Sequence, residues 1–521
     1  MKLISGKHNH FGAVMTTLNE SEISNKYLGQ QFTDAELVIG FVCAVGTEQK
    51  IVNDMLCERL NVFGYTTNEI HISTHIIKDL FSFSNIDCTD EYRRISESMD
   101  AGNTIRFKSK ENSILAMGAA AKINSSREKD DGDNLKYKSK NAYIISSLKH
   151  PEEVKILRDI YTNGFFLIGI YSDESRRLKY LTEDKKIKKE SAIELIKRDA
   201  DEHLDYGQRT SDTFYLSDFF IHLTGNNDKV KNSIWRILDL IFGHPYITPT
   251  FDEYTMFMAY SASLRSADLS RQVGAVIAKN EEIISSGAND CPRFGGGLYW
   301  PFYDENEKKI IDTKNGRDYT RGRDSNKIEK EKLMNEIALK FEVEGVKKEK
   351  TLDILSKTRI DDITEYGRVV HAEMEAIITC SRNNIITKGG TLYCTTFPCH
   401  NCAKHIIAAG IERVVYVEPY PKSKAADFHD DSISLGFSDG NKTIHFEPFV
   451  GVGPRRFFDL FSMNLGSGYS LQRKDQDGKT IDWKPNKGRL RIQMLPCSYL
   501  DIETATAVLC NTIQKELNHE D

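Results

Sequence analysis

The chain of 521 residues is long enough for about three domains of roughly 150 residues each, so a single compact core is not expected. Its 70 basic and 76 acidic side chains leave a net charge of −6, which argues against a protein that coats a polyanion through bulk positive charge. The longest apolar stretch, residues 37–46, is far shorter than the roughly 20 residues that a membrane helix needs. The polar first twenty residues do not resemble a secretory signal, and ten cysteines are too few for a disulfide scaffold. We therefore expect a cytoplasmic protein with no membrane partner.

The first half of the chain predicts a parallel α/β domain. A continuous apolar run at 36–46 ends at a glycine and leads into a helix at 51–60, as a buried strand and a tight turn would. Two further strands are expected at 142–147 and 164–171, and a helix at 152–161 joins them as a crossover connection. A solvated helical segment at 183–203, a strand at 217–222 and a helix at 228–242 complete the domain.

The second half predicts another α/β unit. It opens with a helix at 255–269 and a hairpin of strands at 273–278 and 283–287, followed by a glycine-rich and then strongly charged insertion at about 292–366. Expected next are a helix at 369–378, strands at 391–395 and 413–417 on either side of a helix at 399–410, a strand at 489–494, and a helix at 502–517 capped by Asp501. We therefore divide the chain into domains at 1–245 and 250–521, the second with a C-terminal extension at about 450–521.

A metal-binding pattern lies in the second domain. His371-Ala372-Glu373 is followed, 28 residues after the histidine, by the pair Cys399 and Cys402 in Pro-Cys-His-Asn-Cys. One imidazole and two thiolates supply three ligands of a tetrahedral zinc ion and leave the fourth position for water, as in catalytic zinc sites. The H-x-E and P-C-x-x-C signature is that of zinc nucleobase deaminases, in which the glutamate moves protons, and this role falls to Glu373. We therefore expect one catalytic Zn²⁺ per chain.

At these residues the chain resembles the cytidine and deoxycytidylate deaminase superfamily, over about residues 255–450. The resemblance implies a mixed five-stranded sheet with helices on both faces, and zinc ligands at His371, Cys399 and Cys402. It also implies that Asn289 contacts the sugar of the substrate and that the backbone of Ala372 contacts the pyrimidine. The chain departs from the commoner pattern at Phe397, where a glutamate usually precedes the proline.

The whole chain is similar to the bacterial anti-phage dCTP deaminases of the AvcD type. The blocks that carry this similarity are residues 295–301, 316–319, 324–326, 395–404, 417–423 and 451–457. The resemblance implies a P-loop-kinase-like parallel-sheet domain, followed by a deaminase domain of α/β/α architecture that drains the deoxycytidine nucleotide pool during infection. It favours free dCTP, dCMP or both as substrate.

Other interpretations of the metal-binding pattern remain open. A structural zinc site would recruit a fourth protein ligand and would need no carboxylate beside the histidine, and a thioredoxin-like pair would not need His371. A polynucleotide cytosine or adenine deaminase would use the same signature, although the net charge gives it no support. A housekeeping dCMP deaminase and a regulatory protein with an inactive zinc site are further alternatives.

The turn after the first strand resembles a phosphate-binding loop without matching it. A Walker A loop places four residues between its glycines and then Lys and Ser or Thr, whereas five residues separate Gly40 from Gly46 and Thr47 follows without a lysine. We expect nucleotide binding at Gly40, Gly46 and Thr47 without phosphoryl transfer, and a role for this domain in regulation. A small RNA is an alternative regulatory ligand, and a pure scaffold is the alternative role.

Several cations are candidates to hold the phosphate of the substrate, although each is also an ordinary surface or ion-pair residue type. They are Arg265, Arg271, Lys422, Arg455 and Arg456. The expected partners are free deoxycytidine nucleotides and further copies of the same chain in a homo-oligomer.

Overall fold

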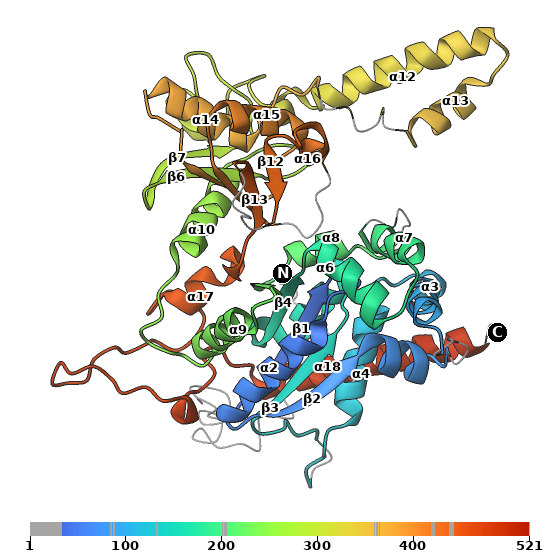
Figure 1. The fold of residues 1–521 in the computed structure, drawn as a ribbon, viewed down its shortest axis with the longest axis vertical. Coiled ribbons are helices and arrows are strands. Elements are labelled where there is room, and N and C mark those ends of the chain that lie inside the picture. The colour runs from blue at the N-terminus through green and yellow to red at the C-terminus, as the bar shows by residue number, and fades with distance from the viewer. Residues whose placement is uncertain are drawn as a thin grey trace, which may run out of the picture.

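The computed structural model describes residues 34–83, 86, 89–131, 134–200, 202, 206–358, 360, 363, 365–417, 423–436 and 442–519. The polar first twenty residues of the chain lie outside this range. No helix within the described ranges is long and apolar enough to cross a membrane. The fold is a mixed α/β arrangement built on two six-stranded sheets (Figure 1).

The first sheet has the strand order β14-β5-β4-β1-β3-β2. All neighbouring strands pair in parallel except β14, which is antiparallel to β5. The strands are β1 (Leu37–Cys43), β2 (Thr66–His71), β3 (Asn141–Ser146), β4 (Phe165–Tyr171), β5 (Phe219–His222) and β14 (Gly451–Val452). The predicted strands β1, β3, β4 and β5 are confirmed. Strand β2 was not predicted, because Ile70 is its only buried side chain and no apolar pattern marks it.

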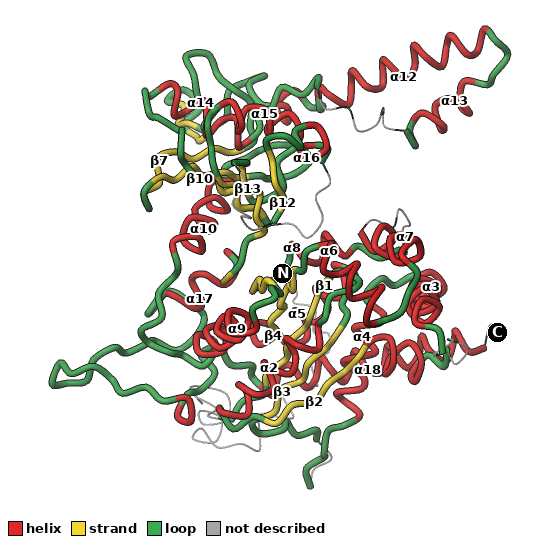
Figure 2. The backbone as a smooth tube through the Cα atoms, viewed as in Figure 1, coloured by secondary structure: helices red, strands yellow, loops and turns green. Residues whose placement is uncertain are grey.

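Helices cover both faces of this sheet, as Figure 2 shows. Alternate residues of β1 enter separate cores: Val38 and Val42 pack with α4 and α5, and Ile39 and Phe41 pack with α2 and α9. The helices are α2 (Gln49–Val62), η1 (Ile72–Leu80), α3 (Glu91–Ser109), α4 (Ile114–Ser125), α5 (Pro151–Tyr161), η2 (Thr162–Gly164), α6 (Glu174–Lys179), η3 (Tyr180–Asp184), α7 (Lys189–Ala200), α8 (Thr210–Tyr215) and α9 (Asn227–Ile241). The segment at 183–203, which we expected to be exposed to solvent, is exposed only in part, because Leu195 and Ile196 of α7 pack with Met99 of α3.

The second sheet has the order β12-β13-β11-β10-β6-β7 and therefore one strand more than the resemblance implied. Its elements are α10 (Phe251–Ser263), β6 (Gly274–Lys279), β7 (Glu282–Ala288), α14 (Ala372–Arg382), β10 (Thr391–Cys394), α15 (His400–Ala408), β11 (Arg413–Tyr416), α16 (Ala425–Phe428), β12 (Ile433–Leu435) and β13 (Ile444–Pro448). The predicted hairpin of β6 and β7 is confirmed. Helices α14 and α15 pack on one face of the sheet, and Met256 and Ala259 of α10 pack on the other.

The expected insertion between β7 and α14 forms an arm that extends away from both sheets (Figure 1, yellow). It contains β8 (Phe302–Asp304), β9 (Lys309–Ile311), α11 (Asp318–Arg321), α12 (Ser325–Val343) and α13 (Lys348–Leu355). Helix α12 buries only Ala338 among its side chains, so the arm adds little to either core.

The C-terminal extension packs on the first sheet. After β14 it forms η4 (Pro454–Arg456), α17 (Phe457–Phe461), η5 (Pro485–Lys487) and α18 (Pro496–His519), and α18 contacts α3, α4 and α5. The strand expected at 489–494 is wrong: Leu490 and Ile492 are buried, but the segment pairs with no strand. The expected cap is also wrong, because α18 begins at Pro496, a residue type suited to the first helical position, and Asp501 lies inside the helix.

A buried ion cluster fastens α18 to the first sheet. The Arg127 guanidinium, after α4, donates to Glu36 beside β1 at 2.9 Å and to Glu503 of α18 at 2.6 and 2.9 Å. Tyr161 donates to Glu503 at 2.7 Å, and Tyr499 donates to Glu36. The three charged side chains are at most 1% exposed, so removing one partner leaves charges without compensation in a dry environment.

We predict that Arg127→Met lowers the free energy of unfolding by about 3–5 kcal/mol, because two buried carboxylates lose their counter-ion. The matched control is Arg209→Met, which removes the ion pair of Arg209 with Asp212, two side chains about half exposed. That change should cost less than about 1 kcal/mol. Urea unfolding monitored by circular dichroism measures both, and equal losses would contradict a dominant role for the cluster.

Candidate metal centre and active site

The three predicted ligands lie at the N-termini of two neighbouring helices. His371 is the residue before α14, with extended backbone (φ −67°, ψ 151°), and Cys399 holds the equivalent place before α15 (φ −70°, ψ 165°). Cys402 follows in the first turn of α15 and is fully buried. The partial positive charge of a helix N-terminus favours thiolates at this position.

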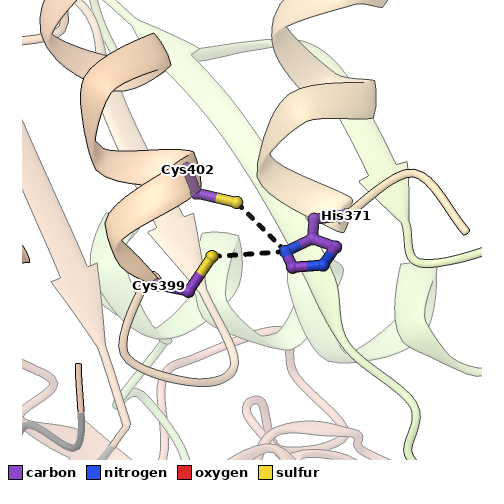
Figure 3. Close-up of side chains that lie close together, drawn as sticks. All are labelled: His371, Cys399 and Cys402. Atoms are coloured by element: carbon purple, nitrogen blue, oxygen red, sulfur yellow. Dashed lines mark hydrogen bonds between the residues drawn. The ribbon is translucent and has the colours of Figure 1, made fainter. Parts of the chain in front are cut away.

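Figure 3 shows the three side chains pointing toward one another. The His371 Nδ1 atom lies 3.4 Å from Cys399 Sγ and 3.3 Å from Cys402 Sγ, and all three ligand atoms lie within 4.8 Å of one another. In a tetrahedral zinc site, bond lengths of about 2.1 and 2.3 Å place nitrogen and sulfur about 3.6 Å apart. The donor set and its spacing therefore fit a zinc ion with three protein ligands.

The two thiols are electrostatically coupled. A hydrogen bond from Cys402 lowers the pKa of Cys399 to about 3, and the same hydrogen bond, together with burial, raises the pKa of Cys402. The Cys399 thiolate raises the pKa of His371 through its hydrogen bond. One thiol of the pair therefore ionises far more readily than the other, and a divalent cation would stabilise both as thiolates.

Glu373 lies in the first turn of α14 and is 3% exposed. Burial raises the pKa of this carboxyl, and the negative charge of Cys399 raises it further, whereas Cys402 lowers it by a hydrogen bond. A carboxyl beside the ligand set that holds a proton more readily than usual has the property required of a proton carrier.

The close approach of α14 to the sheet depends on glycine at position 287. A Cβ atom on Gly287 of β7 would lie 2.2 Å from the Ala372 carbonyl oxygen and 2.6 Å from the Ala376 nitrogen. Any side chain there would therefore displace the helix that carries Ala372 and Glu373. Ala372 itself is fully buried at the start of α14.

Asn289 holds the loop that precedes β6. Its Oδ1 accepts from the Val273 backbone at 2.7 Å, and its Nδ2 donates to the Arg271 carbonyl at 2.8 Å. These contacts occupy the side chain that we expected at the sugar of the substrate. Phe397, the departure from the commoner motif, packs edge-on against Tyr416 with ring centroids 4.8 Å apart, so it extends the core behind the site.

The candidate phosphate-binding cations lie in different environments. Arg265 donates to the Tyr299 carbonyl at 3.0 Å and lies 3.7 Å over the Trp300 ring, and Arg271 is exposed in the loop before β6. Arg455 is exposed at the junction of the two sheets. Arg456 is buried and donates to Asp218, Asp459 and the Phe165 carbonyl, which occupies its guanidinium. Lys422 lies outside the described residues.

The candidate nucleotide-binding residues of the first sheet are separated. Gly40 lies inside β1, where a Cβ would come within 2.8 Å of Leu148 and Phe165, so its glycine serves packing. Gly46 (φ +82°) and Thr47 form the turn between β1 and α2 and line a cavity.

Sequence reasoning missed Tyr215, which ends α8 in the first half of the chain. It lines a small pocket together with Tyr260, Thr395 and Arg455, so it lies beside the segment that leads from β10 to Cys399. A single tyrosine in a short helix carries no sequence signal for such a contact, because Thr395 is 180 residues further along the chain.

We predict that the purified protein holds about one zinc per chain and that Cys399→Ser or Cys402→Ser releases it and lowers the melting temperature, because metal binding is coupled to folding. Cys57→Ser, which changes a half-buried cysteine of α2, is the matched control and should retain the metal. Elemental analysis by mass spectrometry decides the stoichiometry. Two tightly held zinc ions would contradict the account, since the described residues contain only this one cluster of three ligands.

Comparison with known proteins identifies the family of the chain. Residues 249–418 match the family described as the cytidine and deoxycytidylate deaminase zinc-binding region. The deoxycytidylate deaminase of Enterobacteria phage T2 is 33% identical over 175 residues, which cover 32% of this chain and 79% of the phage enzyme. The human deoxycytidylate deaminase is 28% identical over 222 residues, which cover 42% of this chain and 91% of that enzyme. The crystal structure of the dCMP deaminase of cyanophage S-TIM5 is 18% identical, with a TM-score of 0.22 over 39% of this chain and all of the phage chain. The chain belongs to the cytidine and deoxycytidylate deaminase family.

Proposed function

We propose that the protein hydrolyses deoxycytidine nucleotides, dCTP, dCMP or both, to the deoxyuridine nucleotide and ammonia. The observation that carries the proposal is the convergence of His371, Cys399 and Cys402 beside the buried Glu373. A structural zinc site has no use for a carboxyl at that position, whereas a hydrolytic site needs one to move protons.

The chemistry divides between the metal and the protein. When bound, zinc lowers the pKa of water toward about 7 and so supplies a nucleophile at neutral pH. The Glu373 carboxylate takes one proton of the attacking water and gives it to the ring nitrogen, and it then takes the remaining proton of the new hydroxyl group and gives it to the departing amine. His371 and the two cysteines would hold the metal, and the backbone of Ala372, at the start of α14, would contact the bound base.

The substrate class rests on the relatives. Those of phage T2, of phage T4 and of human are named deoxycytidylate deaminases, and the family match at residues 249–418 includes the three metal ligands. A polynucleotide deaminase would use a basic groove with stacking aromatics, and the net charge of −6 gives it no support. We place the reaction in the cytoplasm, where free nucleotides are available.

We propose further that the reaction serves anti-phage defence by depleting dCTP, with the first sheet as the controlling domain. The similarity to AvcD-type deaminases at residues 295–301 and 395–404 supports this role over housekeeping dCMP deamination. The strand order 5-4-1-3-2 around β1, with a turn and helix after β1, is typical of a nucleotide-binding α/β sheet. The missing Walker lysine favours binding without phosphoryl transfer.

The domain division at 1–245 and 250–521 is part of this proposal, but the C-terminal segment of the second domain packs with the first. Residues 451–519 pack on the first sheet, so the deaminase sheet is inserted between two segments that build the other unit. A change in the first sheet therefore reaches the deaminase through both of its chain connections.

Both connections meet at Glu253, which is 1% exposed near the start of α10. Its carboxylate accepts from Arg236 of α9 at 2.7 and 2.8 Å and from the Val452 backbone of β14 at 2.8 Å. The two chain segments that join the sheets are thus held by one buried carboxylate. Together with Tyr215 beside Thr395, this junction supports a regulatory role for the first sheet.

A homo-oligomer is the remaining part of the proposal. The arm between β7 and α14 leaves several large apolar side chains exposed, and such a surface favours contact with another copy of the chain. These side chains are Phe302, Tyr303, Ile310, Phe341 and Val343.

We predict that Glu373→Gln keeps the metal and the fold but lowers turnover of deoxycytidine nucleotides by about 10²–10⁴-fold, because the path of the proton is cut. Glu375→Gln, two residues further on the same helix, changes a carboxylate that pairs with Arg382 and should retain most of the activity. Uracil formation and zinc content are measured on both variants. More than a tenth of the wild-type rate in Glu373→Gln would refute its assignment as proton carrier.

We predict that Gly46→Ala alters control of the deaminase without removing its zinc. The substitution strains a backbone at φ +82° and places a Cβ 2.9 Å from the Arg177 carbonyl, whereas Gly225→Ala, the control, meets no atom within 4 Å. We expect Gly46→Ala to change the cellular dCTP pool, before or during phage challenge, by about fivefold or more relative to wild type. If both variants match the wild type, the first sheet is a scaffold and the regulatory proposal fails.

A further inference from the structure

The first sheet contains a cavity of about 640 Å³ that the deaminase reaction does not use. It lies beyond the carboxyl ends of β1 and β3, at Cys43 and Ser146, where the chain changes direction across the sheet. Open α/β sheets bind ligands at such a point. The volume is in the usual range for small-molecule sites and is too small for a folded RNA.

Three buried polar atoms in the cavity wall, Arg106 Nε, Gln208 Oε1 and Thr47 Oγ1, have no hydrogen-bond partner among the described residues. Arg106 is 2% exposed, and its Nε has no hydrogen-bond partner although its other nitrogens donate to Glu153 and Asn103. Gln208 is 8% exposed, and its Oε1 likewise has none. Buried polar groups are nearly always hydrogen-bonded, so a donor and an acceptor left in one cavity indicate a polar occupant.

Basic side chains outnumber acidic ones in the lining of the cavity, although Arg106 is paired with Glu153 and Lys149 with Asp199. Five basic side chains line it: Lys50, Arg94, Arg106, Lys149 and Lys185. Only two carboxylates, Asp54 and Glu69, line it with them. An anionic ligand therefore meets complementary charge there.

The position of Lys149 places a positive charge beside the turn that follows β1. Lys149 follows β3 in the sequence, yet its Nζ donates to the Cys43 carbonyl at the end of β1 at 2.6 Å and to Asp199 at 2.8 Å. Asp199 in turn accepts from the Val45 backbone at 2.8 Å. The turn after β1 has no lysine at the Walker position. Lys149, which follows the neighbouring strand β3, brings a basic side chain to this turn.

The cavity also has apolar lining residues, among them Ile72, Ile77, Ile95, Met99 and Leu115. An inorganic anion would leave this surface uncovered, whereas a nucleoside phosphate has both an anionic end and a flat, largely apolar base. We propose that the cavity binds a nucleoside phosphate, with Lys149, Arg106 and Gln208 as contacts.

This inference deepens the proposed regulatory role of the first sheet by naming its ligand class and contacts, and it does not require deaminase activity. The contacts also differ from those expected from the sequence. Arg177 and Leu181 pack within 3.0 Å of a Cβ position on Gly46, so protein atoms already cover one side of the turn. Side chains from other elements, and not the turn alone, therefore bind the anionic group.

The test uses the full-length Glu373→Gln protein, in which deamination does not consume the probe. Isothermal titration calorimetry measures the binding of AMP, GMP, UMP and CMP, of their triphosphates and of pyrophosphate, each alone. We expect at least one nucleotide to bind with one site per chain, and pyrophosphate to bind more weakly. Gln208→Leu removes one hydrogen-bond partner and should weaken that binding about tenfold.

Gln208→Glu keeps the shape of the side chain and adds a negative charge, so it should weaken binding of the anion further. Gln476→Leu, at an exposed position far along the chain in the C-terminal extension, is the matched control and should bind the nucleotide as the parent protein does.

Nucleotide binding that is unchanged in both Gln208 variants takes place at another site and overturns the inference. Equal affinity for pyrophosphate and every nucleotide overturns the nucleoside part, and absence of binding by every probe overturns the whole. Uracil formation by the wild-type protein is scored separately, so that a failed deaminase proposal and a failed cavity proposal are distinguishable.

Discussion

The active site depends on how closely two helices approach one sheet. Gly287 brings α14 against β7, and Gly274 brings α10 against the other face, where a Cβ would lie 1.8 Å from the Ala259 carbonyl oxygen. With α14 fixed in this way, His371 and Glu373 meet the N-terminus of α15, whose position follows from the parallel pair β10 and β11. A cluster of three metal ligands with a buried carboxyl beside it therefore results from backbone packing, which brings short side chains together.

The same chain connects this site to a second sheet. The C-terminal segment leaves the deaminase sheet at β13, adds β14 to the first sheet and ends in α18, which the buried ion cluster at Arg127 fastens there. Glu253 ties the outgoing and returning segments together, and Tyr215 lies beside the segment that leads to Cys399. Under the proposed regulation, ligand binding in the first sheet would change the deaminase through small shifts at this junction.

The chemistry was more predictable from the sequence than the architecture. The spacing of the metal ligands and the apolar runs of β1, β3 and β4 are local sequence patterns. Such patterns can be recognised without knowledge of the rest of the fold. Contacts between distant segments cannot be predicted from local patterns. Glu503 pairs with Arg127 across 376 residues, and the sequence around neither residue indicates the pair. The predicted strand at 489–494 failed for the same reason, since its buried Leu490 and Ile492 fill the first core without a strand partner. Arg456, which we predicted as a phosphate contact, donates instead to the buried Asp218 and to the Phe165 carbonyl, two distant partners that no local pattern revealed.

The most direct test of the account is the substrate itself. Zinc-loaded full-length protein is incubated with each cytosine nucleoside, nucleotide and oligonucleotide, and uracil formation is followed by mass spectrometry. The account predicts uracil from free deoxycytidine nucleotides, dCTP, dCMP or both, and none from single-stranded DNA or RNA. Deamination of an oligonucleotide in preference to the free nucleotides, or no turnover of any nucleotide by the zinc-loaded protein, would contradict it.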